Sequence, residues 1–106
     1  MNKSKFLMML GLCRKAGCMI MGTPMVTKFL PKAQIITVFY SSDASDNTKK
    51  KIKDKCSFYA TPCIETDILS EELAHAVGKT GALSAVGITD RNFANELSNL
   101  ISNEKR

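Results

Sequence analysis

The sequence predicts an α/β domain in which helices cover both faces of a four-stranded sheet. Short apolar runs rich in β-branched residues alternate, from one end of the chain to the other, with segments whose apolar residues recur at the helical period. The 106 residues suffice for one hydrophobic core, and the apolar content of 44% and charged content of 24% are typical of a globular protein. Because no repeat, linker or low-complexity segment interrupts this alternation, we expect a single three-layer α/β/α sandwich over residues 1–106.

The N-terminal half predicts two helices and two strands. Ser4 can cap the first helix and Gly17 can end it, and the apolar residues between them recur one turn apart: Phe6, Leu10 and Cys13. A strand over 18–21, a helix over 23–31 and a strand over 34–40 follow. Pro31 ends the second helix, and the strand after it is apolar enough to be covered on both faces.

The C-terminal half predicts three helices and two strands. The helices are expected to start at residues whose side chains accept hydrogen bonds from the first turn, namely Ser45 or Asp46, Ser70 and Asp90. The strands are expected over 62–65 and 82–88, the first of them at a sheet edge because of Pro62. In the third helix the core-facing residues are Thr48, Ile52, Cys56 and Tyr59, and the lysines face water.

Residues 22–28, Gly-Thr-Pro-Met-Val-Thr-Lys, join the first strand to the second helix and form the first candidate binding site. Gly22 allows close approach of the backbone, Thr23 can cap the helix, and Pro24 fits a first turn, where its missing N–H costs nothing. Lys28 lies one turn further along. Because a helix start of this kind favours a phosphate, this junction is the first place to expect nucleic acid if the protein binds it.

The charge of the chain is distributed unevenly. Of the net charge of +5, residues 1–64 hold 11 Lys and Arg against 3 Asp and Glu, whereas residues 65–106 hold 4 against 7. The third helix alone contains five lysines: Lys49, Lys50, Lys51, Lys53 and Lys55. A solvated helix surface explains this run, but Arg14, Lys15, Lys28 and Lys32 favour a basic side that faces phosphate.

A second candidate site is the segment Gly78-Lys79-Thr80-Gly81-Ala82-Leu83, between the fourth helix and the last strand. Two glycines and a lysine at this place make a loop that can press its backbone against a ligand. A plain helix cap and turn explains the same residues equally well.

No catalytic or metal site is expected. His75 is the only histidine and is interpreted as a solvated surface residue. The cysteines lack the Cys-x-x-Cys pair typical of structural zinc, and core packing is favoured for Cys13 and Cys56. No Gly-x-Ser-x-Gly motif, P-loop or dinucleotide fingerprint is present. The sequence thus predicts a protein that is not an enzyme and that needs no metal and no cofactor.

The N-terminal apolar stretch over 6–12 is too short to span a membrane and is followed by Arg14 and Lys15 without a small-residue cleavage site. We therefore expect a cytoplasmic protein without a membrane partner. We also expect it to be a monomer.

Four segments, taken together in their order, point to a known family. They are Gly-Leu-Cys-Arg-Lys-Ala-Gly over 11–17, Gly-x-x-x-Val-x-Lys over 22–28, Ser-Asp-Ala-Ser-x-Asn-Thr-Lys-Lys-Lys over 42–51 and Glu-Leu-x-x-Ala-x-Gly-Lys over 72–79. With these the chain resembles the bacterial YlxQ-type proteins of the ribosomal protein L-seven-Ae family, whose members bind kink-turn RNA. The resemblance implies a mixed sheet. It also implies an RNA site formed by the loop into the second helix and the loop before the last strand.

The resemblance carries over position by position. Family members that bind kink-turns typically have Gly-x-Asn-Glu-x-x-Lys at this helix start, where Asn and Glu contact the sheared G·A pairs and Lys contacts phosphate. Gly22 and Lys28 match, whereas Pro24 replaces Asn and Met25 replaces Glu. Neither side chain can make the base contacts, so shape and phosphate recognition is expected instead.

Three functions follow as hypotheses. The first is a ribosomal-protein-like RNA-binding protein that binds ribosomal or kink-turn RNA through residues at the two loops: Gly22, Thr23, Pro24, Met25, Lys28, Lys79, Thr80, Gly81, Ala82 and Leu83. The second is a protein-interaction module in which Pro24 and Met25 belong to an apolar patch. The third, an RNA-modifying enzyme, has the least support because the chain lacks a cofactor loop.

Overall fold

The computed structural model describes residues 2–32 and 34–102 and confirms the predicted α/β class. The helices are α1 (Lys3–Lys15), α2 (Thr23–Phe29), α3 (Asp46–Phe58), α4 (Ser70–Ala76) and α5 (Arg91–Ser102). The strands are β1 (Met19–Met21), β2 (Thr37–Tyr40), β3 (Cys63–Glu65) and β4 (Ala85–Ile88). Every predicted helix and strand is therefore present, in the predicted order.

The four strands form one mixed sheet in the order β1-β4-β2-β3. β3 runs parallel to β2, whereas β4 pairs antiparallel with both β1 and β2. The mixed sheet is the one that the family resemblance implies. β3 lies at an edge of the sheet, as Pro62 predicts.

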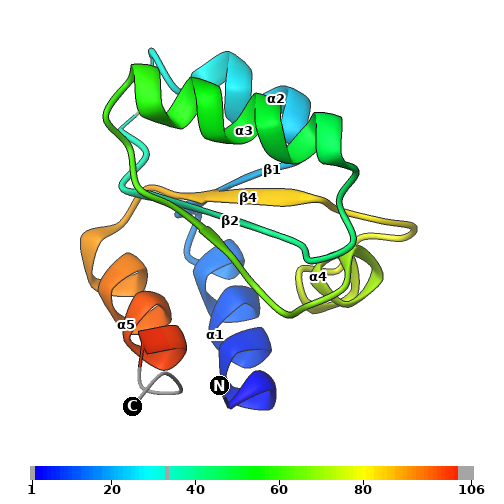
Figure 1. Cartoon of the computed structure of the whole chain (residues 1–106). Helices are drawn as coiled ribbons and strands as arrows, with labels where there is room; N and C mark the ends of the chain where they lie inside the picture. Colours follow the sequence, from blue (N-terminus) through cyan, green and yellow to red (C-terminus); the bar gives the residue numbers. More distant parts are fainter. Residues whose placement is uncertain (1, 33, 103–106) are drawn as a thin grey trace.

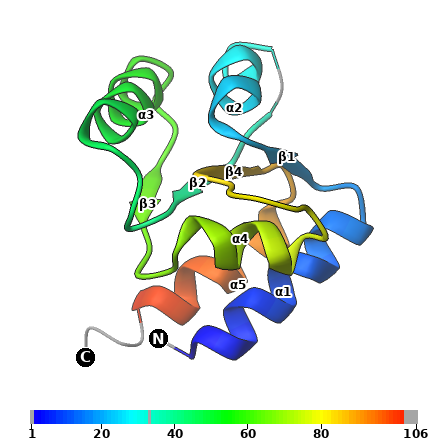
Figure 2. The same cartoon turned by 90° about the vertical axis from the view of Figure 1, so that its right-hand side faces the viewer.

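Helices cover the two faces of the sheet in separate layers (Figures 1 and 2). α2 and α3 lie on one face, and α1, α4 and α5 lie on the other. Neighbouring residues of β2 alternate between these layers: Val38 packs in the core beneath α2 and α3, and Phe39 packs in the other core. There the ring of Phe39 meets Phe6 of α1 edge to face, with a centroid separation of 5.4 Å.

The two central strands are shorter than the sequence predicts. Thr37 pairs with Ile88, the last residue of β4, and Tyr40 pairs with Ala85, its first residue. Residues 34–36 and 82–84 lie beyond this overlap, so the apolar pattern extends past the ladder. The second predicted strand and the fourth were each three residues too long at their N-terminal end.

The first two helices differ from the prediction at their ends. Asn2, not Ser4, caps α1, because its side-chain oxygen accepts a hydrogen bond from the Lys5 N–H at 3.1 Å. Thr23 is the first residue of α2 rather than its cap, which is Gly22. α2 also ends at Phe29, two residues before Pro31.

At the later helices two predicted caps are confirmed and one is wrong. Ser45 accepts from the Thr48 N–H at 3.1 Å and Asp90 accepts from the Phe93 N–H at 3.0 Å. Ser70 is the first residue of α4 and does not cap it. Its hydroxyl donates instead to Asp43, which lies in the loop between β2 and α3.

Candidate nucleic-acid interface

Gly22 forms the turn between β1 and α2 in a backbone conformation that side chains disfavour. Its φ is +93° and its ψ is 143°, a region that is populated almost only by glycine. The Gly22 N–H donates to the Ala85 carbonyl at 2.8 Å, and its own carbonyl accepts from the Val26 N–H at 2.9 Å. The start of α2 is therefore fixed to the start of β4.

Three segments that are far apart in the sequence meet beside this turn and line a pocket of about 420 Å³, which we call the junction pocket. Its residues are Gly22, Thr23, Pro24, Thr48, Lys51, Ala82, Leu83 and Ser84. The two loops that the sequence singled out are thus neighbours in space. They lie at the end of the molecule that faces the reader in Figure 2.

The structure adds α3 to this site through Thr48 and Lys51, neither of which the sequence assigned to it. The two residues are three apart and therefore share a face of the helix. Thr48 is half-buried and was predicted to face the core, whereas Lys51 is exposed. The shared face was visible in the sequence, but the position of α3 beside the α2 junction was not.

Among the described residues, two of the five α3 lysines form ion pairs. The Lys50 ammonium lies 3.0 Å from the Asp54 carboxylate, and the Lys49 ammonium lies 3.1 Å from that of Glu65. Within residues 2–32 and 34–102, Lys51 forms no salt bridge. The positive charge of Lys51 is therefore available to a ligand in the junction pocket.

Met25 and Lys79 meet at a second pocket of about 450 Å³, on the other side of the α2 junction. This methionine pocket is lined by Met19, Ile20, Met21, Met25, Phe29 and Lys79. Met25 is 44% exposed, which is high for a large apolar side chain. Lys28 lines neither pocket; its ammonium lies 5.6 Å from the centroid of the Phe29 ring, within reach of a cation–π interaction.

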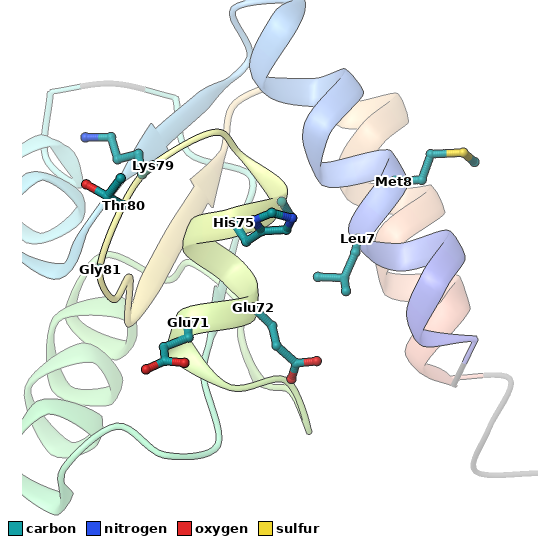
Figure 3. A pocket seen from close by; sticks show the side chains of 9 residues that line it. Leu7, Met8, Glu71, Glu72, His75, Lys79, Thr80 and Gly81 are labelled. Carbon is teal, nitrogen blue, oxygen red and sulfur yellow. The ribbon is translucent and has the colours of Figure 1, made fainter.

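The loop between α4 and β4 exposes its first residues and buries Leu83 near its end. Lys79, Thr80 and Gly81 are exposed, and Gly81 has a φ of +84°. Leu83 is only 6% exposed and belongs to the core beneath α4, so its side chain forms the floor of the junction pocket. Lys79, Thr80 and Gly81 also border a groove of about 910 Å³ between α1 and α4. In Figure 3 the Lys79 side chain points away from His75 and Leu7, which lie in that groove.

Asp43 holds the start of α4 in place. Its two carboxylate oxygens accept hydrogen bonds from the N–H and the hydroxyl of Ser70, both at 2.9 Å. These bonds, the backbone one first, lower the pKa of Asp43 below its ordinary value. The Ser70 carbonyl in turn accepts from the Leu83 N–H at 3.0 Å. One chain of hydrogen bonds thus links the loop before α3 to the floor of the junction pocket.

Two of the four cysteines, Cys13 and Cys56, are buried in the core. Burial raises the pKa of both Cys13 and Cys56 to about 12, in agreement with the predicted core packing. Over the described ranges, no three His, Cys, Asp or Glu side chains come together as a metal site would require. His75 is exposed, as predicted. In the same residues, no helix has the length and apolarity needed to cross a membrane.

Two curated proteins resemble this chain in sequence over nearly its full length. It is 38% identical to the RNA-binding protein YlxQ of Enterococcus faecium over 101 residues, which cover 94% of each chain. It is 33% identical to the RNA-binding protein YlxQ of Bacillus subtilis, over 95% of this chain and 99% of the relative.

Among solved structures, a protein of unknown function from Bacillus halodurans superimposes with a TM-score of 0.85. It is 34% identical, over 94% of this chain and 99% of the other. A family model matches residues 5–98, which include both candidate loops and α3. The chain therefore belongs to the ribosomal protein L7Ae/L30e/S12e/Gadd45 family.

Proposed function

We propose that this protein is a non-enzymatic RNA-binding protein that binds structured RNA at the junction pocket. The observation that carries the proposal is the convergence on one pocket of the α2 junction, the loop before β4 and Lys51, whose cation has no salt-bridge partner among the described residues. The YlxQ relatives, which are named as RNA-binding proteins, support the same ligand class. Ribosomal RNA and kink-turn RNA in the cytoplasm are the proposed partners of a monomeric protein.

In this proposal the backbone and the lysines make the contacts. Gly22 has no side chain, so a sugar or phosphate can approach the turn closely. Lys51 and Lys79 flank the α2 junction from its two sides, and Lys28 extends from α2. These groups recognise phosphate and shape.

Pro24 and Met25 limit which features of an RNA the site can recognise. Both side chains are exposed beside the junction, yet Pro24 offers no hydrogen-bonding group and Met25 only a weak sulfur acceptor. These positions therefore provide no amide or carboxylate that could form hydrogen bonds with the sheared G·A pairs of a kink-turn. We expect binding that is weaker than that of a family member with Asn and Glu at these positions.

Two measurements test the proposal. Affinity for kink-turn and ribosomal RNA is measured across salt concentrations, and contact with roughly three to five phosphates gives a log–log slope of about −2 to −4. The variant Pro24→Asn with Met25→Glu is expected to gain kink-turn affinity, and Pro24→Ala with Met25→Ala is its matched control. A flat salt dependence, or equal affinity of all three proteins, would show that this surface does not bind RNA.

The second candidate function, a protein-interaction module, is favoured by the methionine pocket. Met25 is exposed at the rim of a pocket that is lined by three methionines, and methionine suits adaptable apolar contacts. Purification of the protein from its host lysate with and without nuclease distinguishes the two functions. A partner that remains after nuclease treatment and is lost in Met25→Glu supports the interaction module.

A further inference from the structure

Phe58, the last residue of α3, is 80% exposed, which makes it the most exposed of the large apolar side chains in the described residues. Together with Lys51, Asp54, Lys55 and Tyr59, it lines a pocket of about 530 Å³, which we call the aromatic pocket. Nothing in the proposed RNA contacts at the junction pocket uses this side chain. An exposed aromatic ring between lysines needs another explanation.

The aromatic pocket and the junction pocket are neighbours on α3, because Lys51 lines both. Lys51, Lys55 and Phe58 follow one another at spacings of four and three residues and therefore form one stripe along α3. From Lys51 to Phe58 the stripe covers about 10 Å at 1.5 Å per residue. A ligand that leaves the junction pocket along α3 reaches the Phe58 ring.

The charge of the aromatic pocket is positive where a ligand would pass. Its single acidic residue, Asp54, already accepts a hydrogen bond from Lys50 at 3.0 Å, so it is compensated from outside the pocket. Lys51 and Lys55 form no ion pair within the described part of the chain. An anionic ligand is therefore favoured over a neutral or cationic one.

The Phe58 ring is held in place from one side. It meets Tyr59 edge to face, with a centroid separation of 4.9 Å and an interplanar angle of 83°. Tyr59 is half-buried and packs against the core beneath α2 and α3, so it is a fixed neighbour. A ring that is restrained yet exposed suits the stacking of a nucleobase, which every base can provide.

We propose that the stripe Lys51–Lys55–Phe58 binds single-stranded nucleotides that continue from the structured RNA, with one base stacked on Phe58. At about 3.4 Å per stacked nucleotide, the stripe accommodates about three nucleotides beyond the junction pocket. Lys51 and Lys55 contact their phosphates. The inference rests on the proposed function for its starting point, the RNA at the junction pocket, but it concerns a separate surface.

The test uses the full chain and a kink-turn RNA with a tail of six adenosines. Four RNAs, with the tail on the 5′ or 3′ strand of either stem, are compared with the blunt parent RNA. We expect one tail to raise affinity about tenfold, within the range that base–aromatic stacking produces. With 2-aminopurine placed along that tail, fluorescence is expected to change most near the third nucleotide.

Variants of Phe58 identify the ring as the cause. Phe58→Leu should remove the gain from the tail and leave affinity for blunt RNA unchanged, and Phe58→Trp should retain the gain. Met8→Ala, which shortens another exposed side chain on the opposite side of the sheet, should leave both affinities unchanged. Because Phe58 is exposed, these variants are expected to keep the circular dichroism spectrum and melting temperature of the parent.

The outcomes separate this inference from the proposed function. If blunt RNA binds and no tail adds affinity, or the gain survives in Phe58→Leu, the inference is wrong and the proposed function stands. If kink-turn RNA does not bind but hexa-adenosine binds in a Phe58-dependent manner, the inference stands alone. Absence of binding to kink-turn RNA, ribosomal RNA and hexa-adenosine overturns both. A dimer that Phe58→Leu dissociates in sedimentation overturns the inference in favour of a protein contact.

Discussion

The Asp43 carboxylate accepts two hydrogen bonds from Ser70, one from its N–H and one from its hydroxyl, across 27 residues of sequence. The Asp43 side chain, from the loop before α3, therefore caps the first turn of α4 in place of a residue next to it in sequence. Since Ser70 also binds the Leu83 N–H, this contact supports the loop that carries Lys79.

Replacement of Asp43 by Ala should lower the free energy of unfolding at pH 7 by about 1 kcal/mol, the usual effect of a lost helix cap. Asp43→Asn keeps an acceptor for the Ser70 N–H and should lose less. Urea unfolding followed by circular dichroism measures both. If Asp43→Ala is as stable as the parent, the contact with Ser70 contributes nothing to folding.

The same contact predicts a dependence of stability on pH. The folded pKa of Asp43 lies below its ordinary value of 3.8, mainly because of the Ser70 N–H, so its stabilising effect is complete above about pH 5. It is lost as the pH falls through 3.8 toward the lower folded pKa. Glu72, whose pKa Lys3 and the Leu69 N–H lower, acts over a similar range. Asp43→Asn should therefore reduce, but not abolish, the loss of stability between pH 5 and pH 2.

Gly22→Ala should weaken both folding and RNA binding. A Cβ at Gly22 would meet only Leu83 and Pro24, at 3.8 and 3.9 Å, so the cost is backbone strain of about 1–3 kcal/mol at its positive φ. Gly17, with a φ of +76° and nothing within 4 Å of an added Cβ, provides the control. Gly17→Ala should lose stability but retain RNA affinity under native conditions. Equal loss of RNA affinity in both variants would show that Gly22 does not contact the RNA.

The cysteines offer a test of the core. Burial raises the pKa of Cys13 and Cys56 to about 12, so few of these thiols are ionised at pH 8. Cys18 and Cys63 are only partly buried. Mass spectrometry after alkylation at pH 8 should find Cys18 and Cys63 modified first, and Cys13 and Cys56 only after denaturant is added. Early modification of Cys56 would mean that the core beneath α3 opens in the native state.

The sequence was sufficient for the elements and much of the core, because periodicity and β-branched runs are local signals. Phe6, Leu10 and Cys13 are buried as their spacing predicts. The prediction that Ser70 caps α4 was wrong. A serine at a helix start suggests a local hydrogen bond, whereas Ser70 donates to a residue 27 positions earlier. The role of Lys51 could not be predicted, because it depends on how α3 packs beside the α2 junction, which is a tertiary relationship. The RNA contacts themselves stay predictions.

Lys51→Ala should reduce the steepness of the salt dependence of RNA binding by about one unit and weaken binding to different RNAs to a similar extent, because a phosphate contact carries no sequence information. Lys51 lines both the junction pocket and the aromatic pocket and has no salt-bridge partner among the described residues, so its removal leaves no acidic side chain unpaired.

Lys53→Ala is the matched control, since Lys53 lies two positions away on α3 and lines neither pocket. It removes the same charge from the same helix, and any effect of net charge alone would appear in both variants. We expect Lys53→Ala to leave the slope nearly unchanged when affinities are measured between 50 and 200 mM salt. Equal slopes for the two variants would mean that α3 attracts RNA only through its total charge, and that Lys51 makes no direct contact.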